Sequence, residues 1–106
     1  MTNSIKVIHC AFDYQPVHVA TVQTEDLTIM DGLEYAFRWT QNIEDSWSMK
    51  GEHDGNDNVT IVASLHEGLN GQVYGLRSTS VGDKMIVNCL TYLVDSIGFK
   101  LLDPVN

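Results

Sequence analysis

Apolar and polar residues recur along this chain with two different periods, which predict strands at both ends and one helix between them. Residues 5–12 are β-branched and mostly apolar, and residues 17–23 alternate with period two. Further strand candidates are residues 59–65, 72–76, 84–89, 91–95 and 98–102. Turn-forming residues separate these segments, and Asn70-Gly71 is a strong hairpin signal.

Residues 24–41 predict the long helix. Thr24 precedes two acids, and a hydroxyl cap followed by acidic side chains is typical of a helix start. Apolar residues then recur every three or four positions, so we expect an apolar stripe that lies on the sheet. Gly32 falls within this stripe. We expect either close packing of that turn against a strand or a helix with a soft centre.

These elements predict an α+β fold: a mostly antiparallel sheet of about five strands with the helix packed on one face. The C-terminal strands are expected to form a meander. A chain of 106 residues, 43% of them hydrophobic, can bury one core but hardly two. Residues 1–106 are therefore interpreted as one globular domain.

The segment RSTSVGD, residues 77–83, places three hydroxyls, a glycine and an Arg/Asp couple between two apolar segments. One interpretation is a structured turn in which Gly82 takes positive φ, Arg77 pairs with an acid and the hydroxyls bond to backbone groups. The other is a site for an anion or small ligand. For that site the candidate ligand-binding residues are Arg77, Ser78, Thr79, Ser80 and Asp83.

We also expect this turn to pack beside the C-terminus of the helix and Trp47. A turn rich in local hydrogen-bond partners leaves few donors for a ligand, and Val81 and Trp47 both need apolar cover. Trp47 stands between two serines and is large enough to anchor the segment that follows the helix.

The charge is strongly negative and unevenly placed. The formal net charge is −8, and ten of the fourteen acids fall between residues 25 and 67. This balance disfavours direct binding to nucleic acid, which needs clustered Lys and Arg. The acidic middle is either a solvated face or a surface complementary to a basic partner, such as a host protein. As candidate partner-binding residues we take Glu44, Asp45, Glu52 and Asp54.

The two cysteines, Cys10 and Cys89, are far apart, and both lie in β-like segments where we expect buried thiols. The N-terminus lacks the pattern of a secretion signal, so we expect a cytoplasmic protein with reduced thiols. No apolar run approaches the ~20 residues of a membrane-spanning helix, so no membrane association is expected.

Signals for catalysis, metals and cofactors are weak. The loop at residues 54–58 begins like a calcium loop but lacks the glycine and the bidentate Glu that follow in such loops. No pair of histidines has zinc-site spacing, and no P-loop or dinucleotide fingerprint is present. The hydroxyls of residues 78–80 have no activating base adjacent in sequence, so only the fold can bring a histidine beside them. We therefore predict no metal, no cofactor and no catalytic residues.

The order of several short motifs resembles that of a group of small, largely uncharacterised phage and bacterial proteins. These motifs are Thr40-Gln41-Asn42-Ile43, Ser46-Trp47, the RSTSVGD segment and Gly98-Phe99. The resemblance spans roughly residues 17–102 and implies a mobile-element origin and a small α+β fold. It implies no particular activity.

Two functional hypotheses follow. The first is a non-enzymatic accessory protein of a phage or other mobile element, acting through protein contacts of the acidic surface. The alternative is a small-ligand or anion-binding module, possibly an enzyme, centred on residues 77–83.

Overall fold

The computed structural model describes residues 2–12, 15–42, 47–48, 58–62, 66–67, 73–74 and 76–102. Its elements in chain order are β1 (Thr2–His9), β2 (Val17–Glu25), α1 (Ile29–Arg38), β3 (Val59–Ile61), β4 (His66–Glu67), β5 (Val73–Tyr74), β6 (Lys84–Val87), β7 (Leu90–Asp95) and β8 (Gly98–Leu102). The predicted α+β class is confirmed. The main sheet has six strands, close to the predicted five, and β4 and β5 form a separate pair.

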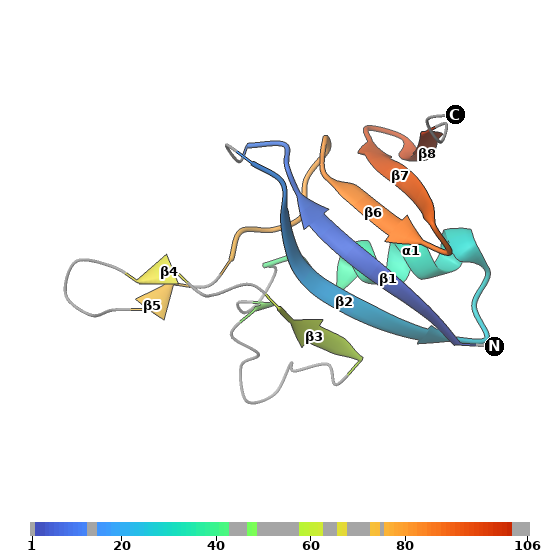
Figure 1. Ribbon diagram of the computed structural model, residues 1–106, viewed down its shortest axis with the longest axis horizontal. Coiled ribbons are helices and arrows are strands. Elements are labelled where there is room, and N and C mark those ends of the chain that lie inside the picture. The colour runs from blue at the N-terminus through green and yellow to red at the C-terminus, as the bar shows by residue number, and fades with distance from the viewer. Residues whose placement is uncertain are drawn as a thin grey trace.

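Every pairing in the main sheet is antiparallel, in the order β3-β2-β1-β6-β7-β8. The C-terminal strands β6, β7 and β8 form the predicted meander. β1 is the central strand, because it pairs with β2 on one side and with β6, from the far end of the chain, on the other (Figure 1). The β4–β5 pairing has the antiparallel form that the Asn70-Gly71 signal predicts, although that dipeptide lies outside the described residues.

The helix begins later than predicted. Thr24 is a buried residue of β2, and α1 instead begins after Thr28, whose hydroxyl accepts a hydrogen bond from the Asp31 amide at 3.1 Å. Both threonines precede acidic residues, so both carry the cap signal. The strand takes Thr24 because β2 stays paired with β1 as far as Thr2 and Glu25. The helix is only ten residues long and ends at Arg38, short of the predicted end at residue 41.

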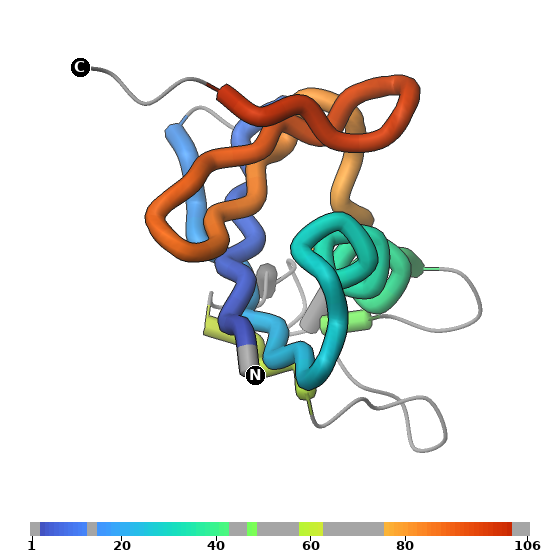
Figure 2. The backbone as a smooth tube through the Cα atoms, turned by 90° about the vertical axis from the view of Figure 1, so that its right-hand side faces the viewer, coloured from blue at the N-terminus to red at the C-terminus, as the bar shows by residue number. Residues whose placement is uncertain are grey.

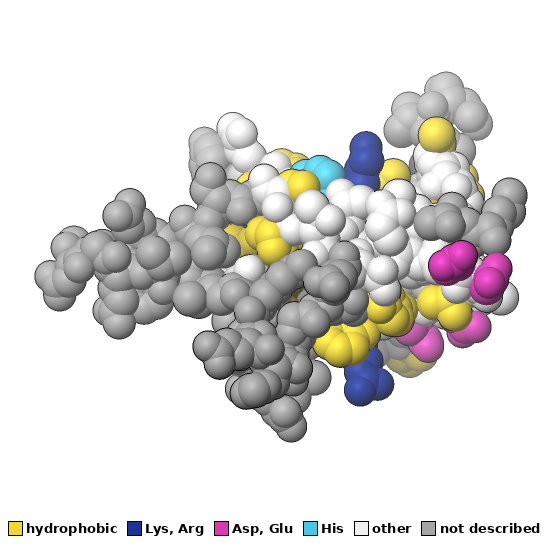
Figure 3. All heavy atoms as spheres, turned by 90° about the horizontal axis from the view of Figure 1, so that it is seen from below, with side chains coloured by type: hydrophobic (Ala, Val, Ile, Leu, Met, Phe, Trp, Pro, Cys, Tyr) yellow, Lys and Arg dark blue, Asp and Glu magenta, His cyan; other side chains and the backbone are white. Residues whose placement is uncertain are grey.

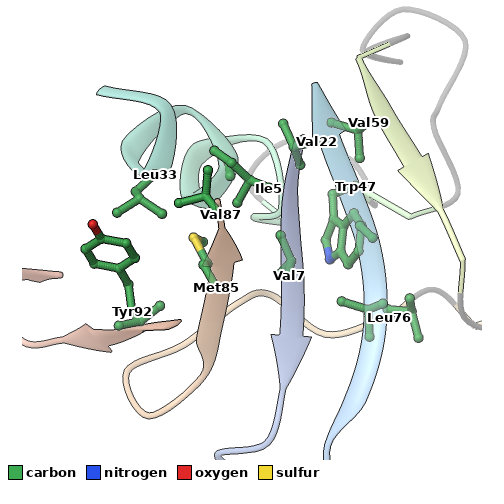
Figure 4. Packing of buried hydrophobic residues seen from close by; sticks show 14 residues of the cluster. Ile5, Val7, Val22, Leu33, Trp47, Val59, Leu76, Met85, Val87 and Tyr92 are labelled. Atoms are coloured by element: carbon green, nitrogen blue, oxygen red, sulfur yellow. The ribbon is translucent and has the colours of Figure 1, made fainter. Parts of the chain in front are cut away.

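The core lies between the helix and one face of the sheet. Figure 2 shows α1 on one side of the strands, and no other described helix covers the opposite side. Alternate residues of β1, β6 and β7 point toward the helix, as period-two alternation requires. Figure 4 shows this layer, in which Leu33 of the helix lies next to Val87 and Met85, in one cluster with Val7.

Gly32 lies where the helix packs tightly against the sheet. A Cβ at this position would be 3.1 Å from Ile5 Cδ1 and 3.4 Å from Thr24 Oγ1. Of the two alternatives predicted for this glycine, close packing against strands is confirmed. The absent side chain lets β1 and β2 contact the helix backbone directly.

Two other expectations concern the cysteines and the membrane. Cys89 is not buried in a strand: it is exposed in the β6–β7 turn, where Asn88 and Cys89 have φ values of 52° and 64°. The two-residue turn between paired Val87 and Leu90 requires this left-handed backbone, so the β-branched neighbours misled the prediction. Cys10 is half-buried. Within the described residues, the structure contains no helix long and apolar enough to cross a membrane.

Substitutions at Gly32 test the close helix–sheet contact. Gly32→Ala should change the free energy of unfolding by less than about 1 kcal/mol, because better helix propensity offsets the tight contact with the end of the Ile5 side chain. Gly32→Leu should destabilise the protein by roughly 1–3 kcal/mol, because the added atoms overpack the layer. Urea denaturation measures both. Equal stability of the two variants would show that the helix can move away from the sheet freely.

Candidate functional site

The carboxylate of Asp83 lies at the centre of a buried polar cluster. Its side chain is 0% exposed, and Asp83 immediately precedes β6. Oδ1 accepts hydrogen bonds from the backbone amides of Cys10 at 2.8 Å and Ala11 at 2.9 Å. Oδ2 accepts one from the Ser80 amide at 2.8 Å. The carboxylate therefore joins the end of β1 to the RSTSVGD turn.

Arg77 completes this cluster through both terminal nitrogens of its guanidinium. One nitrogen donates to Oδ2 of Asp83 and the other to Oδ1, each at 2.7 Å. This fork geometry gives strong, directional hydrogen bonds. The guanidinium also lies 5.2 Å from the ring centroid of the exposed Phe12. The arrangement agrees with the first interpretation of the turn, in which Arg77 pairs with an acid.

These contacts determine the charge state of Asp83. Burial is the largest single influence and raises the pKa of the carboxyl, because a charge out of water is unfavourable. The Arg77 guanidinium and the three backbone amides together outweigh burial and lower the pKa from 3.8 to about 2. Asp83 is therefore an anion at neutral pH.

A histidine enters the same cluster from β1. His9 is 2% exposed, and its Nε2 lies 2.9 Å from Thr79 Oγ1 and 4.0 Å from Asp83 Oδ2. Its ring meets Trp47 edge-on, with centroids 6.1 Å apart. The fold thus brings a histidine beside the hydroxyls of the turn, 70 residues from Thr79 in the chain.

The geometry of His9, Thr79 and Asp83 differs from that of a catalytic triad. In a triad the acid holds one ring nitrogen while the hydroxyl contacts the other. Here Thr79 and Asp83 both face Nε2, and Thr79 is only 1% exposed. A substrate has no access to a hydroxyl buried in this way. The contacts are those of a structural network that satisfies buried polar groups.

The turn also docks on the end of the helix, as predicted. The Thr79 amide donates to Thr40 O at 3.0 Å, and the Asn42 amide donates to Ser78 Oγ at 2.8 Å. The Gln41 side-chain amide donates to Thr79 O at 2.8 Å. Backbone groups left unpaired beyond the helix C-terminus therefore find partners in the turn.

Trp47 is the second predicted neighbour of the turn, and it is buried. Its indole Nε1 donates to Arg77 O at 2.8 Å, and its backbone amide donates to Asn42 Oδ1 at 2.9 Å. Ser48 Oγ accepts from the Leu76 amide at 2.6 Å. The expectation for Val81 is wrong, because this side chain is 54% exposed. Residue 81 lies at the tip of the turn and points to solvent, while the flanking residues make the internal bonds.

The described contacts argue against the alternative interpretation, an anion site at residues 77–83. The donors that such a site would use are bonded inside the protein: both terminal nitrogens of Arg77 and the amide of Ser80 to Asp83, and the amide of Thr79 to Thr40. An anion would have to displace a buried carboxylate from these groups. Binding there stays a prediction that these contacts disfavour.

The two predicted sets of site residues have different outcomes in the structure. It brings Arg77, Ser78, Thr79, Ser80 and Asp83 together in one turn. The predicted partner residues Glu44, Asp45, Glu52 and Asp54 lie outside the described residues. Sequence reasoning did not assign His9 or the Cys10 and Ala11 amides to the site. No local pattern signals them, since they reach the turn only through the pairing of β1 with β6.

Comparisons with protein-family models, curated proteins and solved structures found no match. The resemblance to phage and bacterial proteins therefore rests on the motifs alone. Three of them, at residues 40–42, 47 and 77–83, contact one another in this cluster. Within the described ranges, no group of three His, Cys, Asp or Glu residues is arranged to hold a metal ion.

Gly82 tests the backbone of the turn. It has φ +99°, and a Cβ there would lie 3.0 Å from the Ala11 Cβ. Gly82→Val should destabilise the protein by more than the ~1 kcal/mol typical of point mutants, because strain adds to the contact with β1. Gly98→Val is the matched control: φ is also positive, at +81°, but a Cβ meets nothing within 4 Å. In thermal unfolding, Gly82→Val should have a lower melting temperature than Gly98→Val. The reverse order would contradict this account of the turn.

The ionisation of Asp83 predicts a pH dependence of stability. The folded pKa of about 2 lies below the unfolded value of 3.8, so the stabilisation is complete above about pH 4 and is lost as pH falls toward 2. The shift corresponds to about 2 kcal/mol. Asp83→Asn should be less stable at neutral pH and should lack this part of the acid dependence, whereas exposed Asp95→Asn should keep it. Denaturation across this window measures both, and carbon NMR titration of wild-type Asp83 gives its pKa directly.

Proposed function

We propose that this protein is a non-enzymatic accessory protein of a phage or other mobile element that binds a basic host protein through its acidic surface. The mobile-element part of this proposal comes from the motif resemblance. The binding mode comes from the charge and from one exposed surface. The buried, internally bonded state of the RSTSVGD turn favours this function over ligand binding at the turn.

The observation that carries the proposal is a mixed acidic and apolar surface at the start of α1. Four acids around the β2–α1 connection are exposed together with two large apolar side chains. This acidic helix surface consists of Glu25, Asp26, Leu27, Met30, Asp31 and Glu34. Figure 3 shows acidic side chains gathered at one end of the molecule, with apolar side chains beside them.

This composition fits a protein contact better than a purely solvated face. Acidic side chains accelerate encounter with a basic partner and select its orientation. Leu27 and Met30 supply apolar area that a partner can cover, and methionine adapts to irregular surfaces. Asp31 and Glu34 lie one turn apart on the helix and can contact a pair of basic residues at once.

Affinity capture with defined variants tests the proposal. The immobilised wild-type chain should retain a basic protein from host extract, and Glu25→Gln/Glu34→Gln should reduce retention roughly fivefold or more, because two complementary charges are lost. Quantitative mass spectrometry measures the retained protein. A second variant neutralises the predicted residues Glu44, Asp45, Glu52 and Asp54 and tests their contribution separately.

Asp95→Asn is the control for charge alone. Asp95 is exposed and lies on β7, away from the start of α1, and its Oδ1 accepts from the Ser96 amide, a contact that Asn can keep. This variant should retain the partner as wild type does. Equal retention by wild type and by both acid-neutralised variants would reject the proposal.

A further inference from the structure

The face of the sheet turned away from α1 carries a regular arrangement of lysines and aliphatic side chains. Strand registers place its central residues in two rows that cross five strands from β2 to β8. The first row is Thr21, Lys6, Ile86, Thr91 and Leu102, and the second is His18, Ile8, Lys84, Leu93 and Lys100. These ten residues, the outer sheet face, are all half-buried or exposed. In Figure 1 this face is turned toward the viewer, with the helix behind it.

Charge on this face is opposite to that of the molecule. In the two rows Lys6, Lys84 and Lys100 stand among threonine and aliphatic residues, and neither row contains an acid. Glu25 and Asp95, the last residues of β2 and β7, alternate onto the same side of the sheet outside these rows. Among the described residues, the ion pairs are those of His9 and Arg77 with Asp83, so none of these lysines is paired to a described acid. The chain has a net charge of −8 but carries basic and aliphatic side chains in the centre of this sheet face.

The chemistry of this face indicates an acidic and apolar protein surface as its occupant. Nucleic acid is disfavoured by the net charge and by the absence of Phe, Tyr and Trp, the large rings for base stacking, among these ten. An anionic membrane is disfavoured by the same net charge. The acidic helix surface of the chain itself has the required composition, with four acids around Leu27 and Met30.

We propose that the outer sheet face binds the acidic helix surface of a second copy of this chain. The proposal rests on the proposed function in one respect, because both use the acidic helix surface.

A contact between two different surfaces of one chain is heterologous. An open assembly of such contacts keeps one unused face of each kind, at its two ends, so association continues beyond a dimer unless the ring closes. Weight-average mass should therefore rise with concentration without stopping at a dimer. The overall charge opposes association, so the contact belongs to the weak, transient class.

Complementation between two variants tests this contact. Lys6→Glu/Lys100→Glu removes the basic face, and Glu25→Gln/Glu34→Gln weakens the acidic one; all four residues are exposed. Each variant alone should stay monomeric in sedimentation velocity at concentrations where wild type associates. An equimolar mixture should form dimers and no larger species, because it contains one working pair of surfaces. Arg38→Glu, an exposed charge reversal one turn from Glu34, removes no acid of the helix surface and no lysine of the sheet face, so it should not weaken association.

Several outcomes would overturn the inference. These are a wild type that stays monomeric at all concentrations, variants that associate alone, and a mixture that stays monomeric although circular dichroism shows both variants folded. Binding of duplex DNA or of phosphatidylserine vesicles that Lys6→Glu/Lys100→Glu abolishes would assign the face to another occupant. Host-protein capture that persists while the mixture stays monomeric would reject self-association and leave the proposed function standing.

Discussion

The ionised carboxylate of Asp83, held out of water by five hydrogen bonds, is the constraint on which the rest of this structure depends. A buried anion is tolerated only when its acceptor sites are filled. Filling them requires the end of β1, the RSTSVGD turn and the start of β6 to meet at one point. The RSTSVGD turn also forms hydrogen bonds with the helix C-terminus and Trp47. A single charge thereby coordinates segments from across the chain.

Local patterns predicted the fold where periodicity and packing agreed. The helix period, the alternation in β2 and the C-terminal meander all follow from residues close in sequence. The start of the helix was missed because Thr24 and Thr28 carry the same capping chemistry, and only the length of the β1–β2 pairing decides between them. Cys89 was misplaced because its turn requires left-handed backbone at both residues, and Cys, unlike the neighbouring Asn88, rarely adopts it.

The candidate site was predictable only in part, because some of its contacts join residues far apart in the sequence. The RSTSVGD segment has the composition of a structured turn, and positive φ at Gly82 follows from that composition. The role of His9 does not, because its partner Thr79 is 70 residues away and a β-strand histidine has many possible environments. The exposure of Val81 depends on which side of the turn meets β1. Composition alone does not decide that.

The central place of β1 also has a kinetic consequence. Its pairing with β2 closes a short loop between His9 and Val17, whereas its pairing with β6 joins Lys6 to Ile86, 80 positions apart. A tenfold longer loop adds about 2 kcal/mol of closure entropy. We therefore expect the β1–β2 hairpin to form early and β1 to keep one unpaired edge until the C-terminal meander pairs with it. High contact order of this kind slows folding. In this order the buried cluster around Asp83 forms last, so it stabilises the native fold but contributes little to the rate at which the fold is reached.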